Sequence, residues 1–126
     1  CVSPSDFGFH NVLIHKKKLS FFDFEYAGFD DPVNLLANFF CQPSIPVLNR
    51  YFSMLTQGFL GGESFAFERF ELVYPLCKIK GGLLVLNLFL EVEAKRRNFA
   101  GANEDKEKQL VLAHFFFDGV KGIFPA

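Results

Sequence analysis

Two short apolar runs near the start of the chain are separated by a cluster of lysines. The runs are Val12–Ile14 and Leu19–Phe22, and Lys16–Lys18 lies between them. Apolar runs of this length, bounded by polar residues, favour strands over helices. The pattern therefore predicts a β-hairpin with its turn at the lysines. The preceding stretch, Val2–Phe9, has no regular period and is predicted to be a loop.

From residue 31 onwards the apolar residues recur at helical spacing. Asp31 followed by Pro32 is typical of a helix start, with the aspartate at the N-cap and the proline at the first helical position. The predicted helices are Val33–Cys41, Val47–Phe59, Ser64–Tyr74, Leu76–Leu90 and Glu104–Val120. Breaks are expected at Gln42–Pro46 and at Pro75, which kinks or divides the helical pattern around it.

The most apolar of the predicted helices is Leu76–Leu90. We expect it to be the buried central helix, and a strand is the local alternative. Its start is interrupted by Lys78, Lys80 and two glycines, and the stretch is too short to span a bilayer as an isolated segment. The charged stretch that follows, Glu91–Asn98, is predicted to be a solvated helix end.

These patterns predict an α+β fold that is mostly α, in which a small hairpin packs on about four to five helices. With 126 residues the chain is long enough for one domain with its own core. We therefore expect residues 1–126 to form a single domain.

Composition narrows the classes of function. Half of the residues are apolar and 19 are Phe, so the core is expected to be aromatic. A net charge of −1 gives no overall field for nucleic acid or a membrane surface. Cys1, Cys41 and Cys77 are odd in number and lack metal-ligand spacing, which favours a reducing cytoplasm. No signal peptide or lipidation motif is found, so we expect a cytoplasmic protein without nucleic-acid or membrane partners.

Three oxygen-bearing side chains are expected to meet at the open end of the hairpin. Asp6 and Asn11 precede the first strand, and Asp23 follows the second strand. An antiparallel hairpin brings Asp23 back beside Asn11. Carboxylate and amide oxygens suit a hard cation such as Mg²⁺.

The same residues lie in two motifs that resemble a known family. SPSDFGFHN (residues 3–11) and DFEYAGFDDP (residues 23–32) resemble segments of the aminoglycoside phosphotransferase and choline kinase family, which shares the plan of its C-terminal lobe with protein kinases. An aspartate followed five residues later by an asparagine is the spacing of the kinase catalytic loop, and Asp-Phe-Glu stands where protein kinases carry Asp-Phe-Gly. The resemblance covers about Val2–Phe99 and is tight only in Val2–Pro46.

The resemblance implies a role for each of these residues. Asp6 would be the catalytic base that orients the acceptor hydroxyl, and Asn11 and Asp23 would hold the Mg²⁺ ions that bridge the nucleotide phosphates. Glu25 would bind the metal through water or contact the acceptor, and a salt bridge that holds the loop is the structural alternative. Asp31 would support the catalytic loop. The family usually carries His two residues before the base, where this chain has Pro4. We interpret that departure as a subfamily trait that leaves the acceptor open.

The implied function is a phosphotransferase that uses an alcohol group as acceptor. It would move the γ-phosphoryl group of MgATP to a hydroxyl of an amino sugar, a sugar or an amino alcohol, with GTP as another possible donor. We expect this chain to be the C-terminal catalytic lobe, to lack the N-terminal nucleotide-binding lobe, and to be inactive and prone to self-association in isolation. The alternative is a non-catalytic kinase-like lobe that acts as a binding or assembly module.

Overall fold

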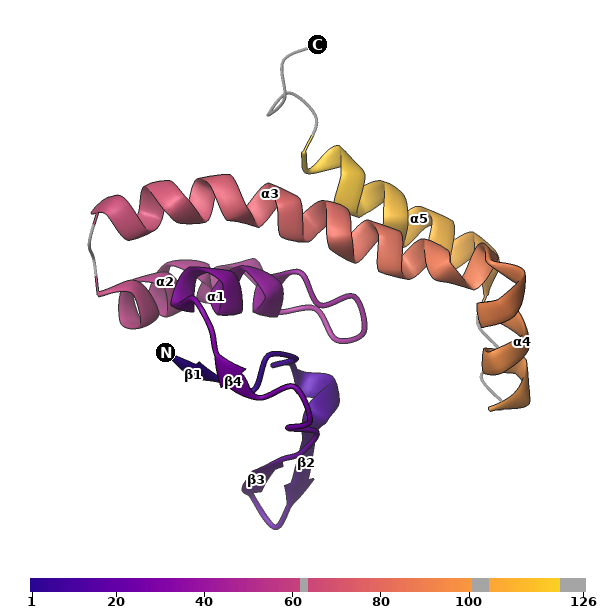
Figure 1. The fold of residues 1–126 in the computed structure, drawn as a ribbon, viewed down its shortest axis with the longest axis horizontal. Coiled ribbons are helices and arrows are strands. Elements are labelled where there is room, and N and C mark those ends of the chain that lie inside the picture. The colour runs from indigo at the N-terminus through magenta and orange to yellow at the C-terminus, as the bar shows by residue number, and fades with distance from the viewer. Residues whose placement is uncertain (62–63, 101–104, 121–126) are drawn as a thin grey trace. The chain divides into compact units, whose positions relative to one another are not determined.

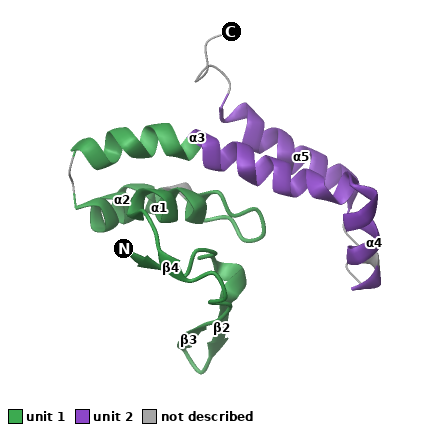
Figure 2. Cartoon of the chain, in the orientation of Figure 1, with its two compact units in different colours: residues 1–74 green, residues 75–126 purple. Residues whose placement is uncertain are grey.

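A computed structural model of the chain describes residues 1–61, 64–100 and 105–120. The fold is α+β and mostly helical, which confirms the predicted class at that level. The chain divides into two compact units, Cys1–Tyr74 and Pro75–Ala126 (Figure 2). The single domain expected from the length of the chain stays a prediction.

The described residues form two small sheets and five α-helices, with short 3₁₀ helices between them (Figure 1). In chain order the elements are β1 (Val2–Ser3), η1 (Phe9–Asn11), β2 (Val12–His15), β3 (Lys18–Phe21), β4 (Gly28–Phe29), α1 (Pro32–Phe40), η2 (Asn49–Tyr51), α2 (Phe52–Leu60), α3 (Ser64–Leu86), η3 (Asn87–Phe89), α4 (Glu91–Phe99) and α5 (Lys106–Asp118).

The predicted hairpin is confirmed. Strands β2 and β3 pair antiparallel, with Val12 opposite Phe21 at the open end. The turn itself contains only Lys16 and Lys17, with φ angles of 46° and 63°, and Lys18 already belongs to β3. Two central residues with positive φ match the twist that a two-residue hairpin turn requires.

A second strand pair was not predicted. Val2–Ser3 forms β1 rather than loop, and it pairs antiparallel with β4, Val2 opposite Phe29 and Ser3 opposite Gly28. The main-chain amide of Asp30 continues this contact by donating to the carbonyl of Cys1 at 2.9 Å. This small sheet joins the segment before Asp6 to the segment after Asp23.

The start of α1 follows the prediction. The Asp31 side chain accepts a hydrogen bond from the Val33 amide at 3.0 Å, and Pro32 is the first helical residue. Helical spacing in the sequence places Val33, Leu36, Ala37 and Phe40 on one apolar face. In the structure Leu35 and Phe39 are buried as well, because α1 is covered from more than one side.

A continuous series of aromatic contacts runs through the first unit. Phe39 of α1 lies at its centre, 7% exposed, with its ring centroid 5.1 Å from that of Phe7 and 5.5 Å from that of Phe9. The whole series, with neighbouring centroids 5.0 to 5.8 Å apart, is Phe21, Phe7, Phe39, Phe40, Phe52, Phe70 and Tyr74. The rings join the hairpin, the loop, α1, α2 and the first part of α3.

The second predicted helix begins later than expected. Val47 and Leu48 are not helical, η2 covers residues 49–51, and α2 runs from Phe52 to Leu60. Gly61 ends it with a φ of 66°, a left-handed cap that favours glycine. Hydrophobic spacing alone missed this start because a 3₁₀ turn presents its side chains at nearly the same intervals.

The helix α3 continues through Pro75, which the sequence predicted to kink or divide it. The boundary between the two compact units falls between Tyr74 and Pro75. The expected buried central helix at Leu76–Leu90 is also wrong in its burial, although its helical assignment up to Leu86 is right. Leu76 is 56% exposed and Leu83 is 55% exposed. The apolar residues of this helix are distributed around its whole circumference, so only some of them can face a neighbouring element.

One helical segment in the described part of the chain is long and apolar enough to cross a membrane by length and composition. It covers Ser64–Phe89, with a mean hydropathy of 1.4 over its 18-residue window, 33% of which is buried. The prediction that Leu76–Leu90 is too short to span a bilayer did not allow for its fusion with residues 64–75. A core helix of a soluble protein passes the same test, so this property alone does not place the chain in a membrane.

The second unit is built around the contact between the end of α3 and α5. A Cβ atom placed on Gly82 would come within 2.8 Å of the Phe117 ring, so the absence of a side chain there lets the helices approach. Phe116 and Ala113 are the buried residues of α5. This helix begins after its N-cap Asp105, and Glu104, where we predicted its start, lies outside the described residues. The charged helix α4 carries the ion pair Lys95–Glu91 at its surface.

We predict that Phe39→Ala lowers the free energy of unfolding by about 3–5 kcal/mol, because it removes a buried ring and leaves a cavity among its partners. Urea unfolding followed by circular dichroism measures this change. Phe29→Ala is the matched control, because Phe29 is 95% exposed in the same unit. Its effect is expected to stay within about 0.5 kcal/mol. Equal losses in both variants would contradict the central position of Phe39.

Candidate functional site

Asp6 is presented by a tight turn. Its main-chain amide donates to the carbonyl of Pro4 at 2.8 Å, and Ser5 between them has a φ of 63°. A hydrogen bond across two residues with a positive φ at the centre defines a γ-turn, which is strained for a residue other than glycine. The Ser3 hydroxyl, which is buried, stabilises the turn by accepting from the Ser5 amide at 2.9 Å.

The Asp6 carboxylate is oriented by two side chains. Gln42 Nε2 donates to Oδ1 at 2.8 Å, and His10 Nε2 lies 3.3 Å from Oδ2. The Asp6 side chain nevertheless stays 49% exposed. The two contacts therefore fix its direction and leave space for a further partner. The structure thus assigns the His10 ring to a contact with Asp6.

The position of His10 depends on Gly8. A Cβ atom on Gly8 would lie 2.6 Å from His10 Nδ1 and 3.0 Å from Gln42 Cγ. Among the residues that the structure describes, Nδ1 is buried and finds no hydrogen-bond partner. An unpartnered buried N–H costs more than an unpartnered lone pair, so the imidazole proton belongs on Nε2, where it is donated to Asp6.

Asn11 connects the loop to the hairpin. Its Nδ2 donates to the main-chain carbonyl of Asp6 at 3.0 Å, and its own carbonyl accepts from the Phe22 amide at 3.1 Å. The residue is 8% exposed. With Nδ2 bonded to the loop, Oδ1 is the atom that remains for a ligand. A main-chain hydrogen bond therefore brings Asn11 next to the end of the second strand, as predicted.

Asp23 follows Phe22 directly but does not line the same pocket. A pocket of about 230 Å³ is lined by Pro4, Asp6, Phe7, Asn11, Phe21, Phe22 and Phe24. Asp23 is exposed and has a φ of 65°, a left-handed backbone that is uncommon outside glycine. The structure therefore brings Asp6 and Asn11 together in one pocket and leaves Asp23 outside its lining.

Glu25 interacts with its neighbour Tyr26. Its carboxylate accepts a hydrogen bond from the Tyr26 hydroxyl and raises the pKa of that phenol, and the negative charge of Asp23 acts in the same direction. Both carboxylates therefore contribute to one local negative field. Metal binding through water and an acceptor contact stay predictions for Glu25.

Asp31 serves the helices. One carboxylate oxygen caps α1 at Val33, and the other is paired with Arg69 of α3. Asp30 accepts from the Asp31 amide at 2.8 Å and from Asn34 Nδ2 at 3.1 Å. The expected support of the catalytic loop is therefore indirect, because α1 carries the Phe39 ring on which that loop rests.

The donor chemistry of Asn11 and Asp23 fits Mg²⁺. Both side chains offer oxygen atoms, the donor type that this ion binds in enzymes that transfer phosphoryl groups. Within the described ranges no cluster of three His, Cys, Asp or Glu side chains could hold a metal ion. A cation here would thus need further ligands, and nucleotide phosphates and water supply them in such sites.

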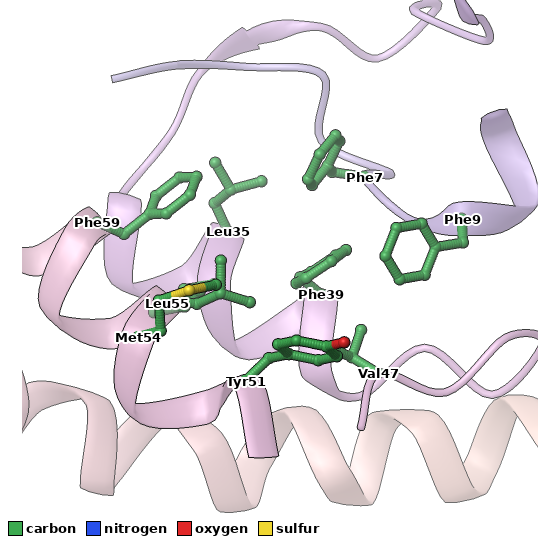
Figure 3. A pocket seen from close by; sticks show the side chains of 10 residues that line it. Phe7, Phe9, Leu35, Phe39, Val47, Tyr51, Met54, Leu55 and Phe59 are labelled. Atoms are coloured by element: carbon green, nitrogen blue, oxygen red, sulfur yellow. The ribbon is translucent and has the colours of Figure 1, made fainter. Parts of the chain in front are cut away.

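A larger apolar cavity was missed by the sequence analysis (Figure 3). It has a volume of about 450 Å³ and is lined by Phe7, Phe9, Leu35, Leu36, Phe39, Val47, Tyr51, Met54, Leu55 and Phe59. Tyr51, Leu55 and Phe59 recur at helical spacing in the sequence, a pattern that predicts core packing. In the structure Phe59 is 48% exposed and Met54 is 61% exposed. Spacing shows that residues share a face, and it does not show whether that face is filled.

Comparisons with protein-family models, with curated proteins and with solved structures find no match for this chain. The family resemblance therefore depends on residues 3–11 and 23–32 themselves. What the structure adds is the set of contacts that those residues make.

We predict that Gly8→Ala destabilises the first unit by about 1–3 kcal/mol, because the new methyl group overlaps the His10 ring. The proton resonances of the His10 ring should shift with it, which one- and two-dimensional NMR can follow. Gly28→Ala is the matched control, since a Cβ atom there meets nothing within 4 Å. A shift of the His10 resonances in the control and none in Gly8→Ala would contradict the described packing.

Proposed function

We propose that this chain is the catalytic lobe of an ATP-dependent small-molecule phosphotransferase. The proposed reaction moves the γ-phosphoryl group of MgATP, or of MgGTP, to a hydroxyl group held near Asp6. The protein is proposed to be cytoplasmic, with a nucleotide and a small hydroxyl compound as its partners and with neither nucleic acid nor a membrane among them. A further lobe is proposed to cover the nucleotide, as in kinase-like enzymes.

The observation that carries the proposal is the strained backbone at the two motif positions. Among the described residues, a positive φ at a residue other than glycine occurs at Ser5, at Asp23 and at the two lysines of the hairpin turn. The lysines are explained by the turn. Ser5 and Asp23 lie in the two motifs, outside the hairpin turn, and such conformations cost about 1–3 kcal/mol and cluster at functional sites.

The carboxylate of Asp6 is suited to accept a proton from an alcohol. Hydrogen bonds from Gln42 and His10 direct it, and half of its side-chain surface is open. In the proposed reaction the hydroxyl oxygen of the acceptor bonds to the γ-phosphorus. The bond between the γ-phosphorus and the oxygen that bridges it to the β-phosphate breaks, and the nucleoside diphosphate leaves. The hydroxyl proton passes to an oxygen of Asp6.

Asn11 and Asp23 would hold the magnesium ions. When bound, these ions neutralise the charge that develops on the phosphate oxygens. Asn11 would use Oδ1, because its Nδ2 is bonded to the carbonyl of Asp6. Asp23 would use its exposed carboxylate, and its left-handed backbone fixes the direction of that side chain relative to Phe22.

We predict that Asp23→Asn abolishes magnesium-dependent nucleotide turnover, with a loss of about 10³-fold or more, while folding is kept. The loss follows from removing a charged metal ligand at an exposed position. The assay measures ADP release by the protein as its source cell produces it, with circular dichroism for folding. Glu107→Gln, a surface change in α5, is the control and should retain full turnover. Unchanged turnover in Asp23→Asn would remove the metal-ligand role.

A non-catalytic binding or assembly module is the second candidate. It is favoured by exposed apolar side chains on the hairpin, where Leu13, Ile14 and Leu19 are 62%, 74% and 61% exposed. Such a surface suits self-association or a partner protein. The two candidates differ in mass. A native product well above 14.3 kDa is expected for the two-lobed enzyme, whereas a product of that mass would favour the module. Intact-mass spectrometry of the native protein decides between them.

A further inference from the structure

We propose that the apolar cavity beside the catalytic loop binds the body of the acceptor, and that this acceptor is a neutral alcohol with an apolar or aromatic group. The inference rests on the proposed function, since it names the substrate class of the same site. It departs from the amino sugars and amino alcohols that the family resemblance implies.

The size and the lining of the cavity suit a small apolar molecule. Its volume of about 450 Å³ lies within the range of roughly 300–1,000 Å³ that is usual for small-molecule sites. Its walls are aromatic and aliphatic, and none of its lining residues carries a formal charge. The Tyr51 hydroxyl is the polar side-chain group among them (Figure 3). Burial of apolar surface would therefore supply most of the binding energy.

Phe7 connects this cavity to the proposed base. It follows Asp6 directly in the chain, and its ring lines both the apolar cavity and the smaller pocket that contains Asp6 and Asn11. The ring is stacked between Phe21 and Phe39, which holds it in place as a shared wall. An acceptor whose body lies against Phe7 thus has the catalytic loop next to it.

The charges around the cavity select against a cationic acceptor. No carboxylate lines it, so a buried ammonium group would lack a counter-ion. Arg50 donates to the Tyr51 hydroxyl at 2.9 Å, and its guanidinium carbon lies 4.8 Å from the centroid of the Tyr51 ring. One aromatic ring of the lining, Tyr51, is therefore already paired with a positive charge. A neutral body avoids both penalties.

A pair of isosteric alcohols tests the charge directly. Choline and 3,3-dimethyl-1-butanol have the same shape and hydroxyl group, and they differ in a quaternary nitrogen and a quaternary carbon. We expect the neutral compound to bind this chain at least tenfold more tightly by isothermal titration calorimetry. Each methylene added to a linear primary alcohol should raise the affinity about fourfold until the cavity is full, the ratio that corresponds to about 0.8 kcal/mol. Tighter binding of choline, or an affinity independent of chain length, would overturn the inference.

Matched substitutions locate the binding. Met54→Trp fills the cavity from an exposed position and should weaken alcohol binding at least tenfold. Leu48→Trp adds the same side chain at a position that is 56% exposed and does not line the cavity, and it should leave binding unchanged. Equal effects of the two variants would place the alcohol elsewhere. Circular dichroism confirms that both variants fold.

Phosphoryl transfer by the native protein separates this inference from the proposed function. Both proposals together predict that 3,3-dimethyl-1-butanol is phosphorylated with a higher kcat/KM than that measured for choline. Binding of the alcohol without any nucleotide turnover would overturn the proposed function and keep the cavity assignment. Turnover with an amino sugar and no alcohol binding would keep the function and overturn this inference. Concentration-dependent dimerisation that Met54→Trp abolishes, without alcohol binding, would assign the cavity to a second copy and overturn it too.

Discussion

The stacking of Phe7 on Phe39 is the contact on which the candidate site depends. Phe7 follows Asp6, and Phe39 lies on the buried side of α1. This pair of rings therefore holds the loop in a fixed position on the helix. Phe9, which precedes His10, packs on Phe39 as well, with its ring edge-on. Aromatic pairs contribute about 0.5–1.5 kcal/mol beyond the area that they bury. Two such pairs, made by Phe7 and Phe9, hold the segment between Asp6 and His10 against α1.

This anchoring explains how a loop can keep a strained backbone. The positive φ angles at Ser5 and Asp23 each disfavour the folded state, and they persist only where surrounding contacts determine the local conformation. Here β1 and β4 pair the start of the first motif with Gly28 and Phe29 of the second, and Asn11 bonds to Asp6 and to Phe22. These hydrogen bonds and the ring contacts of Phe7 and Phe9 together stabilise the strained backbone.

The features that the sequence predicted correctly are those set by neighbouring residues. The Asp31-Pro32 helix start depends on a side chain and an amide two residues apart, and the hairpin depends on two runs and the turn between them. The features that it missed depend on residues distant in the chain. Gln42 reaches Asp6 across 36 positions, and no local pattern marks that pair. Pro75 was predicted to kink or divide the helical pattern, yet α3 continues through it from Ser64 to Leu86. The apolar cavity was hidden for a similar reason, because periodicity cannot distinguish a filled face from an open one.

The two contacts on Asp6 also bear on the one departure from the family pattern. Enzymes of the family that the two motifs resemble usually carry His two residues before the catalytic base, and here Pro4 contributes its carbonyl to the γ-turn instead. The orienting hydrogen bonds come from His10, four residues after Asp6, and from Gln42, two residues after the end of α1. Each carboxylate oxygen has two lone-pair sites, so one bond to each oxygen leaves both able to accept from an alcohol. In the proposed enzyme His10 and Gln42, rather than the residue two positions before the base, therefore orient the carboxylate of Asp6. Phe39 lies in the last turn of α1 and Gln42 follows its C-cap Cys41, so neighbouring residues at one helix end both support the loop and direct its carboxylate.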